Sequence, residues 1–216
     1  MTVELDHVFI CTSPGAPEAE CLLELGLTEG PPNQHPGQGT ACRRFSFKNA
    51  MLELLWVSDQ REAQNEQTRR TLLWERWSGR DTGTCPFGIC LRPADSRQSE
   101  PPFPAWKYRP SYLPEPLVLY VGEGGLQEPW WVYLNFVGRA QREQYFVEHP
   151  IGLSEITGVA LTCTEPPASE TWSLVRDAGI ASLCIGLKPL LAIEFDHGRS
   201  SRVADFRPQL PLLFKF

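Results

Sequence analysis

The stretch that decides the fold is HPGQGTACRRF at residues 35–45, followed closely by MLELLWV at residues 51–57. A polar loop with two glycines leads into one strand, and a second strand follows after a short hinge. Because alternate residues of a strand face opposite sides, Leu52 and Leu54 share one apolar face while Glu53 lies on the other. The pattern therefore predicts a carboxylate inside an otherwise apolar strand.

A second strand with a polar residue at its centre lies near the N-terminus, where LDHVFI occupies residues 5–10. There His7 alternates with Phe9 and Cys11 on one strand face. Imidazole nitrogen and carboxylate oxygen are suitable ligands for Mn²⁺, Fe²⁺, Ni²⁺ or Zn²⁺. A hydrogen-bonded His–Glu pair in a polar cavity is the alternative for His7 and Glu53.

These features together resemble the glyoxalase-like branch of the vicinal oxygen chelate superfamily. The resemblance implies an α+β fold in which repeated βαβββ modules form a cupped, partly open mixed sheet barrel around a central cavity. In this family a His on the first strand and a Glu on the fourth strand often bind a divalent metal. The resemblance therefore makes His7 and Glu53 candidate metal ligands, with a divalent metal ion as the expected cofactor.

An internal similarity organises the chain. When the sequence is shifted by 152 positions, residues 11–22 align with residues 163–174, and six of these twelve positions are identical. Both segments follow an apolar strand and contain a proline turn and a helix that ends at Gly26 or Gly179. The similarity predicts a duplicated βαβββ module, with chance similarity between two amphipathic units as the alternative.

We expect one glyoxalase-like unit over residues 1–216, because a chain of this length can build a single core. Its parts are a first module at 1–57, a helix plus an inserted or degenerate module at 58–154, and a second copy at 155–216. Either the first and last modules pair to close the sheet, or the middle block pairs with the first and the last is appended. The middle block is expected to contain strands near 87–92, 117–121 and 131–136 and a proline-rich loop at 100–116.

The last module does not repeat the expected ligands. Matching the strand hinges places Ala192 opposite Glu53, whereas Glu194 lies two residues further along the same strand face. Glu194 is therefore the candidate for a further metal ligand.

The glycine loop supplies the other candidate residues. His35 is the second candidate for proton transfer beside Glu53, because a histidine pKa of about 6.5 suits acid–base catalysis. Gln38 and Thr40 are candidate ligand-binding residues, since they offer uncharged donors and acceptors. Arg43 and Arg44 lie on opposite strand faces, so one of them can bind an anion in the cavity. The sequence does not decide which, and Arg43 is taken as the candidate.

The bulk properties limit the partners. A net charge of −6 and a pI of about 5.3 argue against nucleic acid and anionic membranes. The N-terminus lacks the pattern of a signal peptide, which predicts a cytoplasmic protein. The seven cysteines include no Cys-x-x-Cys pair, so we expect buried thiols rather than disulfides or zinc ligands. A small-molecule ligand and a second copy of the chain, in a homodimer, are the expected partners.

The expected function is that of a small-molecule enzyme of the lyase, isomerase or dioxygenase type. The alternative is a non-catalytic protein that binds or sequesters a small molecule in the same cavity. Three or four convergent ligands would favour catalysis at a metal, whereas two ligands and an aromatic cavity would favour binding.

Overall fold

The structure is a computed structural model that describes residues 3–94, 100–138 and 144–216. The first block contains β1 (Val3–Cys11), α1 (Ala19–Leu25), β2 (Asn33–His35), β3 (Thr40–Ser46) and β4 (Met51–Val57). The middle block contains α2 (Gln60–Ala63), the 3₁₀ turn η1 (Arg69–Thr71), α3 (Leu73–Ser78), β5 (Phe87–Pro93), β6 (Ala105–Tyr108), β7 (Leu119–Gly122) and β8 (Trp130–Tyr133). The last block contains β9 (Ile156–Cys163), α5 (Glu170–Asp177), β10 (Ser182–Ile185), β11 (Leu190–Phe195), the 3₁₀ turn η2 (Asp196–Gly198), β12 (Val203–Asp205) and β13 (Leu212–Lys215).

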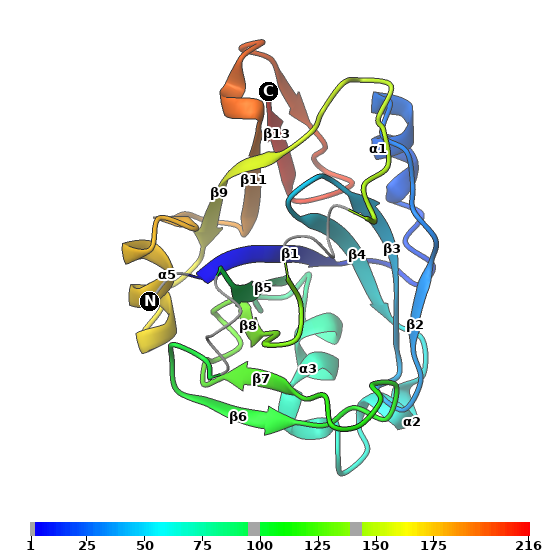
Figure 1. Cartoon of the computed structure of the whole chain (residues 1–216), viewed down its shortest axis with the longest axis vertical. Coiled ribbons are helices and arrows are strands. Elements are labelled where there is room, and N and C mark those ends of the chain that lie inside the picture. The colour runs from blue at the N-terminus through cyan, green and yellow to red at the C-terminus, as the bar shows by residue number, and fades with distance from the viewer. Residues whose placement is uncertain (1–2, 95–99, 139–143) are drawn as a thin grey trace.

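The first and middle blocks build one eight-stranded sheet in the order β2-β3-β4-β1-β5-β8-β7-β6. The order is symmetric about the antiparallel pair of β1 and β5, and on either side β1 pairs in parallel with β4 and β5 with β8. Figure 1 shows this sheet curling from β2 and β3, through β1 and β5, to β7 and β6. The fold is the α+β, strongly curled and partly open sheet that the resemblance implies, and the middle block is the partner of the first.

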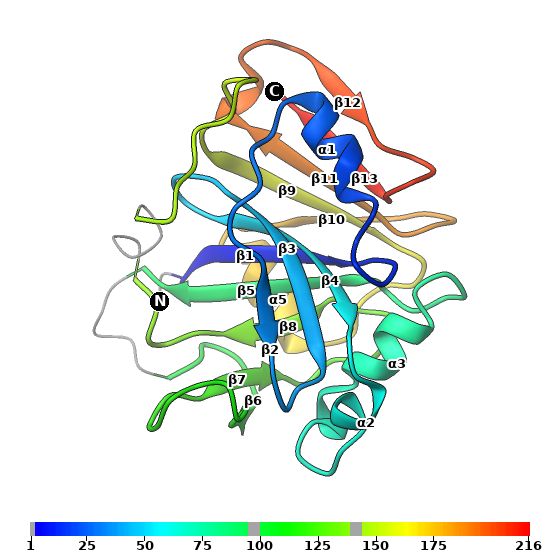
Figure 2. The ribbon, with the colours of Figure 1, turned by 90° about the vertical axis from the view of Figure 1, so that its right-hand side faces the viewer.

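The last block forms a separate five-stranded sheet in the order β10-β9-β11-β13-β12. Its strand, turn and helix occur where the internal similarity predicts them, and the hydroxyl of Ser169 caps α5 by accepting from Trp172 N. The strand pairing differs from the first block, however, because β9 lies directly between β10 and β11, whereas β1 pairs with β4. Figure 2 shows this sheet and α1 at one end of the molecule and α2 and α3 at the other.

One predicted loop contains a strand. The proline-rich segment at 100–116 includes β6, which pairs with β7 at the edge of the large sheet. An edge strand tolerates flanking prolines because only one of its sides takes part in the hydrogen-bond ladder. None of the helices formed by the described residues is long and apolar enough to cross a membrane.

The two faces of the large sheet have different partners. Val8 and Ile10 of β1 and Leu52 and Leu54 of β4 belong to a hydrophobic cluster that continues into the second sheet. The intervening residues of these strands face the inside of the curl, where a second, smaller cluster includes Phe9. Strict alternation in β1 and β4 thus separates the core side of the sheet from its concave side.

A glycine makes room for an aromatic ring on the concave side. Gly88 of β5 lies opposite Phe9 in the register, and a Cβ atom built on Gly88 would lie 2.0 Å from Phe9 Cε1. The Phe9 ring therefore covers the β5 backbone, and it lies 5.9 Å from the ring of Trp130 on β8.

Substitution of this glycine tests the packing. We expect Gly88→Ala to lower the free energy of unfolding by about 1–3 kcal/mol, because overpacking forces Phe9 or its neighbours to move. Urea denaturation measures the difference. Gly125→Ala is the control, since nothing lies within 4 Å of a Cβ atom built there. Equal stability of the two variants would show that Phe9 moves aside at no cost.

Candidate functional site

A cavity of about 200 Å³ lies on the concave side of the large sheet. Its floor comes from β1, β3, β4, β5 and β8, and the segments around Tyr112 and Phe136 close it. The polar residues that line it are His7, Asn33, His35, Gln38, Arg44, Glu53, Cys90, Tyr112 and Trp130. The apolar lining consists of Phe9, Met51, Leu55, Leu113, Leu119, Val132, Leu134, Phe136 and Val137.

The central polar pair is His7 and Glu53, as the sequence predicts. Their atoms Nε2 and Oε2 lie 3.8 Å apart, and the side chains are 14% and 7% exposed. β1 and β4 run in parallel, with His7 beside Met51 and Phe9 beside Glu53, so the two side chains meet diagonally across neighbouring strands. The pair is close enough to share one water molecule or one ligand atom.

A carboxylate that the sequence analysis missed orients His7. The register of β1 and β5 shifts between Leu5 and His7, and this irregularity lets adjacent residues interact instead of facing opposite sides. The His7 Nδ1–H donates to Asp6 Oδ1 at 2.6 Å, so Nε2 is turned toward Glu53. Asp6 is fully buried, and its other oxygen lies 3.4 Å from Arg92 Nη1.

The electrostatic surroundings favour a charged His7. Burial by itself would lower the pKa of His7, but the Cys90 sulfur, the Glu53 carboxylate and the hydrogen bond to Asp6 raise it well above its ordinary value. Burial also raises the pKa of the Cys90 thiol, which therefore stays protonated. We accordingly attribute the stabilisation of the His7 imidazolium to the two carboxylates.

The predicted loop borders the cavity through His35 and Gln38. Asn33 Nδ2 lies 2.9 Å from His35 Nε2, and Thr40 Oγ1 lies 2.9 Å from His35 Nδ1. Burial lowers the pKa of His35, which favours the neutral ring. Both ring nitrogens are thus engaged, so proton transfer by His35 would require one of these contacts to break. Thr40 supports His35 and Gln38 but is not among the lining residues.

The two glycines of the loop serve the protein's own packing. A Cβ atom on Gly37 would lie 1.8 Å from Ser111 Oγ, and one on Gly39 would lie 2.2 Å from Asp59 O. Both residues also have positive φ angles, of 83° and 72°. The sharp turn and the close protein neighbours therefore account for both glycines.

Of the two arginines on β3, Arg44 lines the cavity and the predicted Arg43 does not. Arg43 faces away from the cavity, where its guanidinium group forms ion pairs with Glu20 and Glu29 at 2.9 and 2.5 Å. Arg44 instead lines the cavity and lies opposite Glu53 in the register of β3 and β4. Opposed residues of an antiparallel pair project to the same face, which explains why Arg44 shares the side of Glu53.

The structure separates Glu194 from the other predicted metal ligands. Glu194 lies on β11 in the second sheet, where its side chain packs against Gly158 and Gly198, and it does not line the cavity. β5 and β8 are the counterparts of β1 and β4 in the symmetric strand order. They contribute Cys90 and Trp130 to the cavity lining, and no carboxylate or imidazole.

The side chains that line the cavity provide only part of the ligand set that a metal ion needs. Within residues 3–94, 100–138 and 144–216, no group of three or more His, Cys, Asp and Glu side chains could hold a metal ion. Catalytic zinc sites usually keep three protein ligands and one open position. His7 and Glu53 supply two donors, so we derive no reaction step from a metal.

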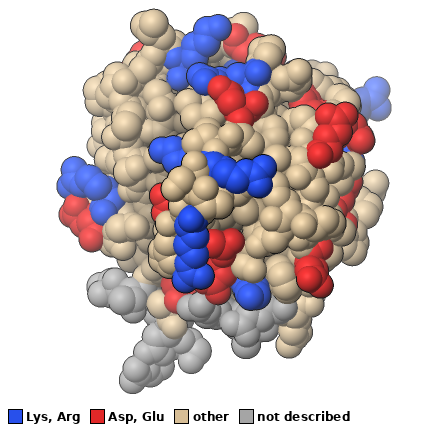
Figure 3. Space-filling model, turned by 90° about the horizontal axis from the view of Figure 1, so that it is seen from above, with Lys and Arg blue, Asp and Glu red and all other residues tan. Residues whose placement is uncertain are grey.

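A larger and more open hollow of about 530 Å³ lies near η2 and involves none of the predicted site residues. Its charged lining residues include Lys48, Asp196, Arg199 and Arg202, of which Lys48 and both arginines are exposed. The end of the molecule seen from above carries Lys and Arg side chains next to Asp and Glu (Figure 3). We place the site in the smaller cavity because buried ionisable groups face each other there.

A half-open, curled sheet with a polar pair at its centre defines a glyoxalase-like protein, and the comparisons agree. The family model described as a glyoxalase-like domain matches residues 5–173. The chain belongs to this family, which is part of the vicinal oxygen chelate superfamily.

The crystal structure of a hypothetical protein from Staphylococcus aureus has a similar fold. It is 13% identical in sequence, the match covers 99% of each chain, and the TM-score is 0.53. No curated protein matches the chain significantly.

The site residues that the sequence analysis missed had weak signals. Asp6 precedes His7 directly, but regular alternation would place its side chain on the other face. Cys90 lies in a predicted strand and Trp130 directly before one, yet nothing in the sequence shows that these strands continue the sheet from β1. Asn33 and Tyr112 lie in segments expected to be irregular.

The buried ion pair of Arg92 and Asp6 provides a test of this arrangement. Arg92 is 1% exposed and also contacts Glu4 and the Asn49 carbonyl. We expect Arg92→Met to lower the free energy of unfolding by about 3–5 kcal/mol, because it removes the guanidinium partner of the buried Asp6 carboxylate. Chemical denaturation measures this loss.

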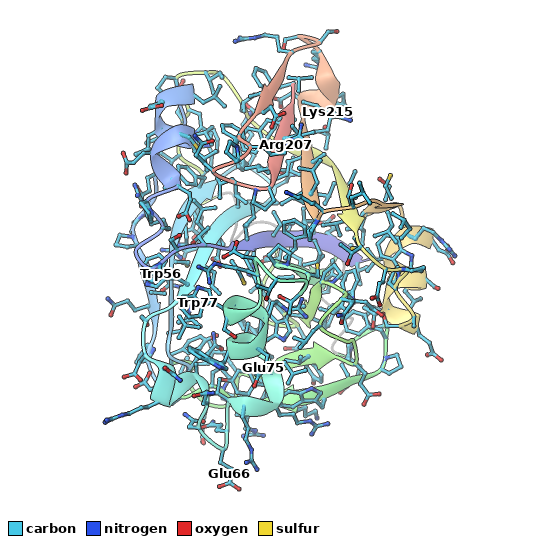
Figure 4. The ribbon with its side chains drawn as sticks, turned by 180° about the vertical axis from the view of Figure 1, so that it is seen from behind. Trp56, Glu66, Glu75, Trp77, Arg207 and Lys215 are labelled. Carbon is cyan, nitrogen blue, oxygen red and sulfur yellow. The ribbon has the colours of Figure 1, made fainter. Side chains whose placement is uncertain are left out.

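Arg207→Met is the matched control. Arg207 pairs with Asp205 on the surface, at the end of the molecule formed by the second sheet (Figure 4). Exposed ion pairs contribute little, so this variant should unfold almost like the wild type. Similar losses in both variants would contradict the assigned importance of the buried pair.

Proposed function

We propose that the protein is an enzyme of the lyase or isomerase type that transfers a proton on a small molecule bound in this cavity. The observation that carries the proposal is the His7–Glu53 pair, which lies in a small cavity and faces an apolar wall. A largely buried acid–base pair in a cavity is a common feature of active sites.

The chemistry follows from the positions of the groups. Glu53 accepts a proton from a carbon atom next to a carbonyl group, which leaves an enolate with negative charge on the carbonyl oxygen. His7 stands beside that charge, and Asp6 fixes the orientation of its ring. The apolar wall excludes water, which strengthens both interactions.

Deuterium exchange tests the proposal without knowledge of the natural substrate. Small ketones and 2-oxo acids, including 4-methyl-2-oxopentanoate, are incubated with the protein in D₂O and followed by proton NMR. We expect the wild type to exchange the hydrogens next to the carbonyl group of at least one compound. Glu53→Gln should slow this exchange by about 100- to 10,000-fold, because the base is removed.

Glu194→Gln is the matched control, since Glu194 is a partly buried carboxylate of the other sheet. Its exchange rate should equal that of the wild type. Equal rates in all three proteins would contradict the role of Glu53.

A non-catalytic binding protein is the second candidate. It is favoured by the lining, half of which is apolar and includes the aromatic rings of Phe9 and Phe136. Compounds that bind the cavity but show no exchange in the wild type would support this candidate and would contradict catalysis by proton transfer.

The divalent metal implied by the family is a separate proposal with its own test. His7 Nε2 and Glu53 Oε2 would hold the ion, and water or substrate oxygen would complete its coordination. Once bound, the ion would polarise a substrate carbonyl oxygen.

We expect calorimetric titration with Mn²⁺, Ni²⁺ and Zn²⁺ to show that Glu53→Ala weakens binding at least tenfold. Glu194→Ala should leave binding unchanged, because its side chain lies outside the cavity. Equal weakening in the two variants would make Glu194 a ligand, and the absence of binding in the wild type would exclude the metal.

A further inference from the structure

Two adjacent arginines of β3 differ in their partners. Arg43 Nη1 and Nη2 contact Glu20 and Glu29, and Nη1 also donates to the Ala16 carbonyl. Arg44 donates only its Nε–H, to the carbonyl of Pro31, and has no ion-pair partner among the described residues. Among the described residues, no carboxylate forms an ion pair with the two terminal nitrogens of Arg44.

Arg44 begins a row of residues that crosses the large sheet. The register places Arg44 beside Glu53, Glu53 beside Phe9, Phe9 beside Gly88, and Gly88 beside Trp130. The sheet curls, so this row wraps around the concave side, where four of its five members line the cavity. A ligand that reaches Glu53 therefore lies next to the unpaired cation of Arg44.

Two further polar atoms, which belong to residues that line the cavity, are buried without a hydrogen-bond partner among the described residues. They are Oε1 of Gln38, whose residue is 3% exposed, and Nε1 of Trp130, whose residue is 8% exposed. Gln38 Nε2 already donates to Thr40 Oγ1, which leaves the amide oxygen as an acceptor for a ligand. Buried polar atoms without partners are costly, so these two indicate hydrogen-bonding groups on the ligand.

The remaining surface limits the size and polarity of the ligand. About 200 Å³ corresponds to the volume of about seven water molecules at roughly 30 Å³ each. Leu113, Leu119, Val132 and Leu134 form part of an apolar wall that suits a branched aliphatic or aromatic group.

From these contacts we infer that the ligand is a small monocarboxylate that carries a hydroxyl or oxo group and an apolar side chain. Its carboxylate binds Arg44, its oxygen substituent reaches Gln38 or Trp130, and its side chain packs against the apolar wall. This inference rests on the proposal that the cavity is the functional site, and it adds the class of the substrate.

A carboxylate fits better than a phosphate. The planar guanidinium group can bind both oxygens of a carboxylate, and a single cation neutralises a single negative charge. A phosphate dianion would carry a second charge close to Glu53, where the like charges would repel each other.

Binding of a matched pair of compounds tests the inference. The probes are 2-hydroxy-4-methylpentanoate and its neutral amide, titrated calorimetrically into the wild type, Arg44→Gln, Arg44→Lys and Arg43→Gln. We expect the wild type to bind the acid about 10- to 100-fold more tightly than the amide, because a hydrogen bond to a charged group is stronger than a neutral one. Arg44→Gln should abolish this preference by weakening only the acid, and Arg44→Lys should retain part of it.

Arg43→Gln is the neighbouring control and should keep the wild-type preference. Amide binding by Arg44→Gln shows that the variant is folded. The inference is overturned if the wild type binds acid and amide equally or does not bind the acid. It is also overturned if Arg44→Gln keeps the preference for the acid or loses both probes equally. The acid probe contains no ketone, so its binding is independent of the exchange reaction. Glu53→Gln should therefore retain the preference for the acid even if proton transfer fails.

Discussion

The cavity depends on the contacts that the buried carboxylate of Asp6 makes with its neighbours. One oxygen holds the imidazole of His7, and the other lies against Arg92, whose guanidinium group also contacts Glu4. A charge in the interior requires partners, and the irregular register of β1 and β5 brings Asp6 within reach of His7, whose ring it orients. The position of Glu53 relative to His7 then follows from the parallel pairing of β1 and β4.

The symmetric strand order of the large sheet produces a cavity with two chemically different halves. β1 and β4 contribute His7 and Glu53, whereas β5 and β8 contribute Cys90 and Trp130. Among the described residues that line the cavity, those from β5 and β8 include no carboxylate or imidazole. The same half instead supplies an aromatic ring and an indole N–H, which suit recognition of an organic ligand.

The polar and apolar parts of the cavity support one chemical interpretation. Glu53 lies between a histidine that can stabilise negative charge and an arginine that has no ion-pair partner among the described residues. An anionic substrate bound to Arg44 would present its neighbouring carbon atoms to Glu53, where a proton can be removed. The apolar wall would bind the side chain of such a substrate and limit the access of water to the reacting atoms.

The sequence by itself determined the family, most strands and the inward position of Glu53, because these follow from local alternation and from short motifs. It also placed Arg43 and Arg44 on opposite faces, but it could not show which face is concave. The concave face is decided by which strands pair and in which register. The same pairing buries Asp6 beside His7 and separates Glu194 from the cavity. Strand pairing is set by contacts between residues far apart in the chain, so only the tertiary structure decided them.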